Sequence, residues 1–140
     1  MVFDDIMYRE ASGLVRGIEL DWTDFDLFDI PYALRMCESK NDDGSQNGLP
    51  AEYHFHENGV CGVYIWEDIG EKNQRPLLLH EVVEIYHKLA LKMSRIDAHN
   101  AALPWEKRFC EEFHTPVELE QYLMFKKQHG YNGFDLVKSD

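Results

Sequence analysis

The segment 77–93 constrains the fold more than any other feature of the sequence. It contains no glycine or proline, and its apolar residues recur at the spacing of a helix. Pro76 directly precedes it and suits the first turn of a helix, where a missing N–H leaves no bond unmade. We therefore expect a helix from Leu77 to about Met93.

Two short runs before this helix predict a β-hairpin. Residues 51–56 and 60–66 are rich in aromatic and β-branched side chains, and Glu57, Asn58 and Gly59 lie between them. An Asn-Gly turn between two such runs favours a hairpin. The preceding segment 39–48 is polar, contains glycine and has no periodicity, so it predicts an exposed loop.

Two more helices are expected at the C-terminal end. Asp97 is a candidate N-cap for a helix over residues 98–113, which Pro104 should kink or split because proline lacks an N–H. The last helix has the strongest start and stop signals of the chain. They are an N-cap at Thr115, a proline at the first position, Pro116, a capping box completed by Glu118, and a helix-ending Gly130.

The first forty residues give weaker signals. Residues 14–22 alternate partly and could form a strand, whereas Pro31 argues against one continuous element over residues 26–36. Strands followed by helices indicate an α+β fold. We expect a single domain over residues 1–140, in which a small antiparallel sheet with a hairpin packs against about three C-terminal helices.

The net charge and the cysteine content indicate which binding partners and which cellular compartment to expect. The net charge of -12 repels phosphate backbones and anionic lipid, so we expect neither a nucleic acid nor a membrane partner. Cys37, Cys61 and Cys110 include no C-x-x-C pair, which argues against a disulfide framework or a cysteine zinc site. The N-terminus shows no signal-peptide pattern. A cytoplasmic location is therefore expected.

The predicted helix 77–93 carries His80, Glu81 and Glu84 at the spacing of a metallohydrolase helix. His80 and Glu84 are four residues apart and share a face, while Glu81 is turned by about 100° from His80. Two ligands at this spacing can bind a metal ion, and the adjacent glutamate can act as the general base on a metal-bound water. His87 continues the same face and is an alternative ligand or a proton donor.

The stretch 79–84 resembles the active helix of zincin metallopeptidases, whose hallmark is HExxH, with Glu84 in place of the second histidine. More closely, the chain resembles small bacterial proteins of largely unknown function in which an HExxE helix precedes a helix with a further His and Glu. His99 and Glu106 match that second helix. The resemblance covers residues 50–113, with the helix pair in 77–113.

This resemblance implies a zincin-like fold and a metal-dependent hydrolase that acts on a peptide or amide bond. Its metal ligands would be His80, Glu84 and His99, and Glu81 would be the general base. Glu106 would be a fourth ligand or a group that orients His99. Nitrogen and oxygen donors without a thiolate suit zinc or another divalent transition metal. The partner would be a peptide or small-molecule substrate.

Two other readings of the sequence remain open. The chain could be a small non-catalytic binding or regulatory protein whose helix pair is structural, with or without a metal. The E-x-x-H pairs 84–87 and 111–114 also resemble those of ferritin-like di-iron proteins, although such sites require four long helices.

Several histidine, cysteine and tryptophan residues are predicted to have a structural role and no role in catalysis or metal binding. His54 and His56 alternate on one face of a predicted strand, which favours the polar face of an edge hairpin. Cys110 is predicted as a buried helix cysteine. The three tryptophans are predicted to lie in the core: Trp22, Trp66 and Trp105.

Overall fold

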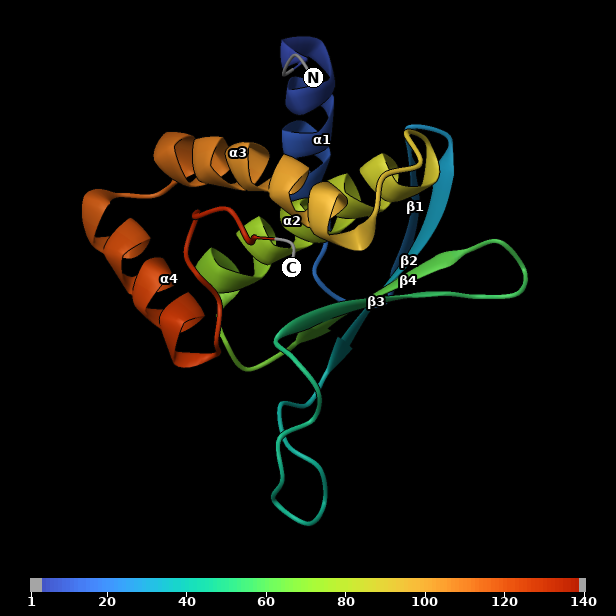
Figure 1. The fold of residues 1–140 in the computed structure, drawn as a ribbon. Helices are drawn as coiled ribbons and strands as arrows, with labels where there is room; N and C mark the ends of the chain where they lie inside the picture. The colour runs from blue at the N-terminus through green and yellow to red at the C-terminus, as the bar shows by residue number, and fades with distance from the viewer. Residues whose placement is uncertain (1–3, 139–140) are drawn as a thin grey trace.

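The computed structural model describes residues 4–138, which contain four helices and one four-stranded sheet (Figure 1). In chain order the elements are α1 (Asp5–Gly17), β1 (Thr23–Leu27), β2 (Ile30–Cys37), β3 (Ala51–Phe55), β4 (Cys61–Trp66), α2 (Glu71–Leu89), α3 (Arg95–Phe113) and α4 (Pro116–Gln128). The strands lie in the order β1-β2-β4-β3. The predicted α+β fold is confirmed. The sheet is mixed instead of wholly antiparallel, because β4 enters between β2 and β3 and runs parallel to β2.

Helix α2 is the centre of the molecule. It contacts α1, α3 and α4, and it also contacts strands β3 and β4. Its buried residues lie between Gln74 and His87 and cover nearly the whole circumference. The Tyr32 hydroxyl on β2 donates a hydrogen bond to the Val82 carbonyl (3.2 Å), which joins this helix to the sheet. In such a core helix, every polar side chain needs a partner or a cavity.

The predicted hairpin over residues 51–66 is confirmed. Strands β3 and β4 pair antiparallel, and Phe55 lies opposite Cys61 across the turn. Gly59 supplies the positive φ of this turn (87°), a conformation that glycine adopts without a steric cost. The hairpin leaves β3 at one edge of the sheet, beside α2.

A second hairpin joins β1 and β2 through a two-residue turn that the sequence did not reveal. Leu27 pairs with Ile30, and both turn residues have positive φ, 52° at Phe28 and 63° at Asp29. Such turns usually contain Asn-Gly, and a bulky residue with positive φ is uncommon. Here the Phe28 ring packs edge-on against Tyr86 of α2 (centroids 5.0 Å apart), which stabilises the conformation.

The N-terminal segment forms helix α1, so the strand predicted for residues 14–22 is wrong. The Asp4 carboxylate caps α1 by accepting hydrogen bonds from the backbone N–H groups of Ile6 (3.0 Å) and Met7 (3.1 Å). The buried residues of α1 follow a helical repeat: Tyr8, Ala11, Ser12 and Val15.

Helices α2 and α3 both begin earlier than predicted. Helix α2 starts at Glu71, so Pro76 lies within the helix instead of in its first turn. The N-cap of α3 is Ser94 instead of Asp97, because the Ser94 hydroxyl accepts a hydrogen bond from the Asp97 N–H (3.1 Å). Helix α3 continues through Pro104 as one element, so this proline does not split it.

The predicted boundaries of α4 are confirmed. The Thr115 hydroxyl accepts from the Glu118 N–H (3.2 Å), and the Glu118 carboxylate accepts from the Thr115 N–H (2.9 Å). At the other end Gly130 has φ 85°, and the N–H of Tyr131 donates to the Lys126 carbonyl (2.9 Å). This is the Schellman arrangement that a helix-ending glycine predicts.

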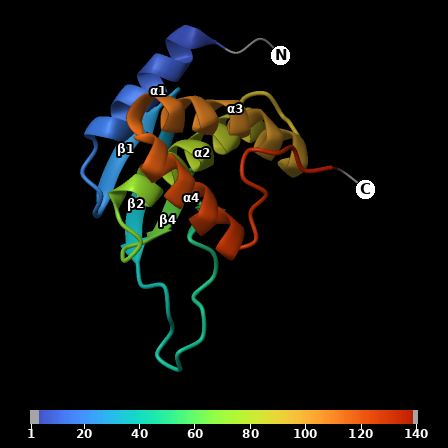
Figure 2. The same ribbon diagram turned by 90° about the vertical axis from the view of Figure 1, so that its left-hand side faces the viewer.

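Two segments without helix or strand complete the fold. Residues 38–50 project away from the helices beyond the end of the sheet, as both ribbon views show (Figures 1 and 2). Residues 131–138 run back from α4 towards α2 and α3 (Figure 1). The Asn100 side chain holds this C-terminal segment by donating to the Val137 carbonyl (2.7 Å) and accepting from its N–H (2.8 Å).

Two of the three tryptophans lie in the core as predicted. Trp66 and Trp105 are buried, whereas Trp22 is 72% exposed and lies beneath the guanidinium of Arg35, so the prediction for Trp22 is wrong. Cys110 is a buried helix cysteine, as predicted. None of the helices in residues 4–138 has the length and apolarity needed to cross a membrane.

Candidate metal centre

His80, Glu84 and His99 meet where α2 faces α3. His80 Nε2 lies 3.2 Å from Glu84 Oε1 and 3.0 Å from His99 Nδ1, and His99 Nδ1 lies 3.1 Å from Glu84 Oε1. His80 and Glu84 are buried, and His99 is half-buried. These three residues form a group that could hold a metal ion.

The triangle of ligand atoms suits a cation better than it suits hydrogen bonds. A ring N–H points along one fixed direction. Seen from one corner of a nearly equilateral triangle, the other two atoms lie about 60° apart, so one N–H cannot make a well-aligned hydrogen bond to both. Tetrahedral zinc with bonds of about 2.0–2.2 Å places its ligand atoms roughly 3.3–3.5 Å from one another. The observed spacings are only slightly shorter, so a small adjustment would accommodate the ion.

Glu106 of α3 lies on the opposite side of the His80 ring from this triangle. Its Oε1 is 2.7 Å from His80 Nδ1, and its Oε2 accepts hydrogen bonds from the Tyr122 hydroxyl (2.6 Å) and from Lys126. Glu106 therefore orients His80 instead of His99, and it lies outside the group of three. A carboxylate on Nδ1 fixes the ring so that Nε2 faces the candidate metal position.

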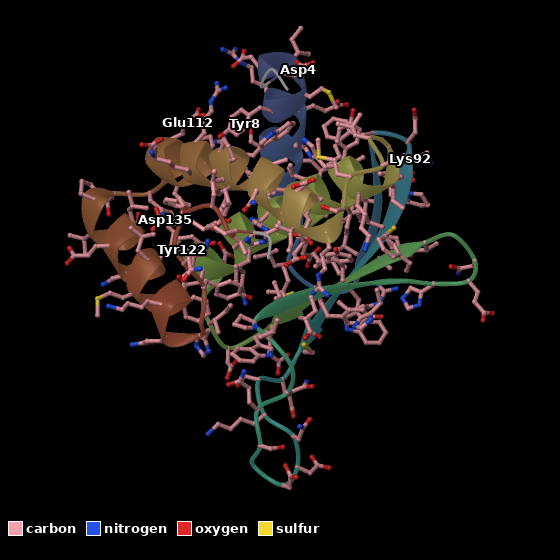
Figure 3. All side chains as sticks on the ribbon, viewed as in Figure 1. Asp4, Tyr8, Lys92, Glu112, Tyr122 and Asp135 are labelled. Atoms are coloured by element: carbon pink, nitrogen blue, oxygen red, sulfur yellow. The ribbon has the colours of Figure 1, made fainter. Side chains whose placement is uncertain are left out.

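The partners of Glu106 come from α4, the last helix. Tyr122, labelled in Figure 3, lies on the side of α4 that faces the centre of the molecule, and it is fully buried. Lys126 lies one turn further along and is 2% exposed, and its ammonium also donates to the Gly133 carbonyl (2.8 Å). The candidate site thus depends on three helices, although its ligands lie on two.

Burial and neighbouring charges act in opposite directions on these groups. Burial disfavours a charged His80, but its bonds to Glu106 and Glu84 raise its pKa to about 10. Burial would raise the pKa of Glu84, but the hydrogen bonds from His80 and His99 lower it below its usual range. Both shifts favour an ion pair between His80 and its glutamate neighbours, and a metal ion bound at His80 Nε2 would displace the proton there.

Glu81 is buried, but its carboxylate makes no hydrogen bond or ion pair within residues 4–138. Burial, together with the charges of Glu84 and Glu106, raises its pKa to about 8 despite the opposing charge of His80. Glu81 and Glu106 both line a cavity, but only the Glu106 carboxylate is bound by His80, Tyr122 and Lys126. A free carboxyl group with a pKa near neutrality is well suited to accept a proton.

The cavity has a volume of about 630 Å³ and runs between the edge strand β3 and the facing sides of α2 and α3. Leu49, Ala51 and Leu77 line one end, and Phe55 and Ile96 line the other. The polar groups His80, Glu81, Glu84 and His99 lie along its wall. An apolar cavity with a few converging polar groups is the usual form of a small-molecule or substrate site.

Two tyrosines that line this cavity were not identified as site residues from the sequence. The hydroxyls of Tyr53 on β3 and of Tyr131 in the C-terminal segment are buried and have no hydrogen-bond partner of ordinary geometry within the described residues. Burial raises the pKa of Tyr53. The nearby Glu84 carboxylate raises the pKa of Tyr53 further. The hairpin prediction placed Tyr53 on a strand, but only the packing of β3 beside α2 shows that it reaches the site.

The remaining histidine candidates do not join the group. His87 is buried, and its Nδ1 lies 2.8 Å from the Val83 carbonyl, so it is neither a ligand nor a proton donor at this cavity. Helix wheel geometry aligned it with Glu84, but its ring packs edge-on against Trp105. His54 and His56 are exposed on the hairpin, where His56 contacts the Tyr64 hydroxyl (3.1 Å).

The two E-x-x-H pairs are not brought together in the described residues. Glu111 is exposed on α3, and both ring nitrogens of His114 are buried without a partner. Comparisons of the chain with known protein families, with curated proteins and with solved structures gave no match.

Proposed function

We propose that this protein is a metal-dependent hydrolase that acts on a peptide or amide bond. His80, Glu84 and His99 would hold the metal, and Glu81 would be the general base. The observation that carries the proposal is the Glu81 carboxylate, which faces the same cavity as the three-atom cluster and has no ionic partner among residues 4–138. A structural metal site has no need of such a group.

The donor set fits a catalytic metal. Two imidazole nitrogens and one carboxylate oxygen are ligands of catalytic zinc, and three protein ligands leave a position for water. A metal in this position would lower the pKa of a coordinated water and polarise a carbonyl oxygen. The same donors also suit other divalent transition metals.

The chain's own residues would supply the positioning and the proton transfer. Glu106 holds the His80 ring, so that Nε2 keeps its direction towards the metal position. Glu81 would accept a proton from the attacking water and return it to the leaving amine. The hydroxyl of Tyr53 would be an additional donor for the substrate carbonyl, because it lies beside Glu84 without a partner of ordinary geometry.

Metal analysis of the purified protein tests the first half of the proposal. We expect about one equivalent of divalent metal in the wild type after zinc loading and dialysis, and much less in His80→Ala and His99→Ala. His54→Ala is the matched control, because His54 is exposed and lies outside the group. Equal, negligible metal in all four proteins would refute the site.

Activity on a mixture of internally quenched peptides tests the second half. We expect the zinc-loaded wild type to cleave the mixture, and Glu81→Gln to retain metal but lose at least about 100-fold of the activity, which is the usual contribution of a general base. Glu120→Gln is the control, because Glu120 is exposed on α4. Metal binding without cleavage of any peptide would favour the non-catalytic alternative, in which the metal only joins α2 to α3.

A further inference from the structure

Acidic and basic side chains both line the cavity, and the acidic ones are Glu52, Glu81, Glu84 and Glu106. Three basic side chains line it: Lys88, Arg95 and Lys126. Lys126 is paired with Glu106. Within residues 4–138, Lys88 and Arg95 form no ion pair with a carboxylate, although acidic residues outnumber basic ones nearly twofold. Two cations without anionic partners therefore lie at one end of the candidate site.

Both residues lie one helical turn from a proposed metal ligand. Lys88 follows Glu84 by four residues on α2, and Arg95 precedes His99 by four residues on α3. Side chains at this spacing are neighbours on a helix surface, at about 5–6 Å between their Cβ atoms. The two basic groups thus converge on the same end of the cavity from two different helices.

Local contacts hold these side chains beside the cavity. The Lys88 ammonium lies 5.5 Å from the ring centroid of Phe55 and 6.0 Å from that of Tyr53, which is the range of a cation–π contact. Arg95 is close enough to Glu81 and Tyr53 for its charge to act on both groups.

Several hydrogen-bond donors line the cavity beside its carboxylates. Lys88 and Arg95 can only donate, and the buried hydroxyls of Tyr53 and Tyr131 have no hydrogen-bond partner of ordinary geometry in the described residues, although Tyr53 lies near Glu84 and Tyr131 near Ala51. Hydroxyls buried without a partner cost free energy that a ligand with acceptor oxygens would recover. A ligand group with acceptor oxygens can therefore accept hydrogen bonds from Lys88, from Arg95 and from these hydroxyls.

We propose that the substrate carries a carboxylate, which Lys88 and Arg95 bind one helical turn away from the metal position. This inference rests on the proposed function, since it defines the substrate class of the same site. An acidic side chain or a free C-terminus next to the scissile amide has the required chemistry. The uncharged remainder of the substrate would pack along the apolar wall at Phe55 and Ile96.

Two metal-binding probes that differ in one group test the inference. Succinic acid monohydroxamate carries a carboxylate two methylene groups from its hydroxamate, whereas butyrohydroxamic acid has a methyl group there. We expect the zinc-loaded wild type to bind the carboxylate probe about tenfold more tightly, as measured by calorimetry, since one or two charge-assisted hydrogen bonds supply that much.

Variants that remove a positive charge test whether Lys88 and Arg95 cause the preference for the carboxylate probe. We expect Lys88→Gln and Arg95→Gln each to lower the preference about threefold, and the double variant to abolish it while still binding butyrohydroxamic acid. Lys92→Gln is the matched control and should retain the full preference, because Lys92 lies in the turn between α2 and α3 and does not line the cavity (Figure 3).

Each outcome has one meaning. Equal binding of both probes by the wild type would overturn the carboxylate proposal and leave the metal site intact. A preference that survives in the double variant would also overturn it. Binding of neither probe by a protein without metal would overturn both proposals, whereas the expected pattern in the variants supports both.

Discussion

The buried pair of Glu106 and Lys126 gives the most quantitative prediction. Glu106 is 1% exposed and Lys126 is 2% exposed, and Glu106 also accepts from Tyr122 and bonds to His80. Removing one partner of a buried pair typically costs about 3–5 kcal/mol, because the other charge remains buried. Glutamine keeps the volume and part of the hydrogen bonding, so we expect Glu106→Gln to lower the free energy of unfolding by about 3 kcal/mol.

A double-mutant cycle in urea isolates the pair. Lys126→Met removes the buried cation and keeps an apolar stem, so adding it to Glu106→Gln should recover part of the stability, with a coupling energy of about 2 kcal/mol. The metal-free protein is used, so that metal affinity does not enter the measurement. Lys127→Met, at the exposed neighbouring position, should change stability by less than about 0.5 kcal/mol. A coupling energy below about 0.5 kcal/mol would refute the reasoning, because it would mean that the pair is effectively hydrated.

The remaining predictions concern the fold and the metal. Thr115→Ala should lower the free energy of unfolding by about 1 kcal/mol, measured in urea, because it removes the capping box of α4. Leu78→Ala should cost about 2–5 kcal/mol, whereas Trp22→Ala should cost less than about 1 kcal/mol, because Leu78 is fully buried and Trp22 is mostly exposed. Zinc binding at pH 7.5 should release about one proton, since the pKa of His80 near 10 keeps it protonated without metal. Affinity should therefore rise with pH up to about 10, and calorimetry in two buffers of different ionisation enthalpy would contradict this if it found no released proton.

Local signals allowed parts of the fold to be predicted from the sequence. The capping box at Thr115 and the Asn-Gly turn at 58–59 each depend on a few adjacent residues, and the structure has both. The spacing of His80 and Glu84 follows from helix geometry alone. Their meeting with His99 needed the additional expectation of a second helix beside the first, which resemblance supplied.

The errors arose where tertiary contacts decide the conformation. Phe28 and Asp29 form a tight turn without glycine, because Phe28 packs on α2, and no local pattern indicates this. The parallel pairing of β2 and β4 joins segments that β3 separates in the chain. Glu106 was expected as a fourth ligand or as a group that orients His99, but its carboxylate bonds to His80. The direction of that carboxylate depends on Tyr122 and Lys126 of α4, and no local pattern places α4 beside the site.

The dependence of His80 on α4 has a consequence for how the protein acquires its metal during synthesis. The ligands are all translated by residue 99, but the groups that neutralise and orient the carboxylate behind His80 follow at residues 122 and 126. A nascent chain that ends before α4 has the ligands without the buried ion pair that fixes them. Tight metal loading would therefore follow the synthesis of α4, and it would report that the chain has folded from α2 through α4.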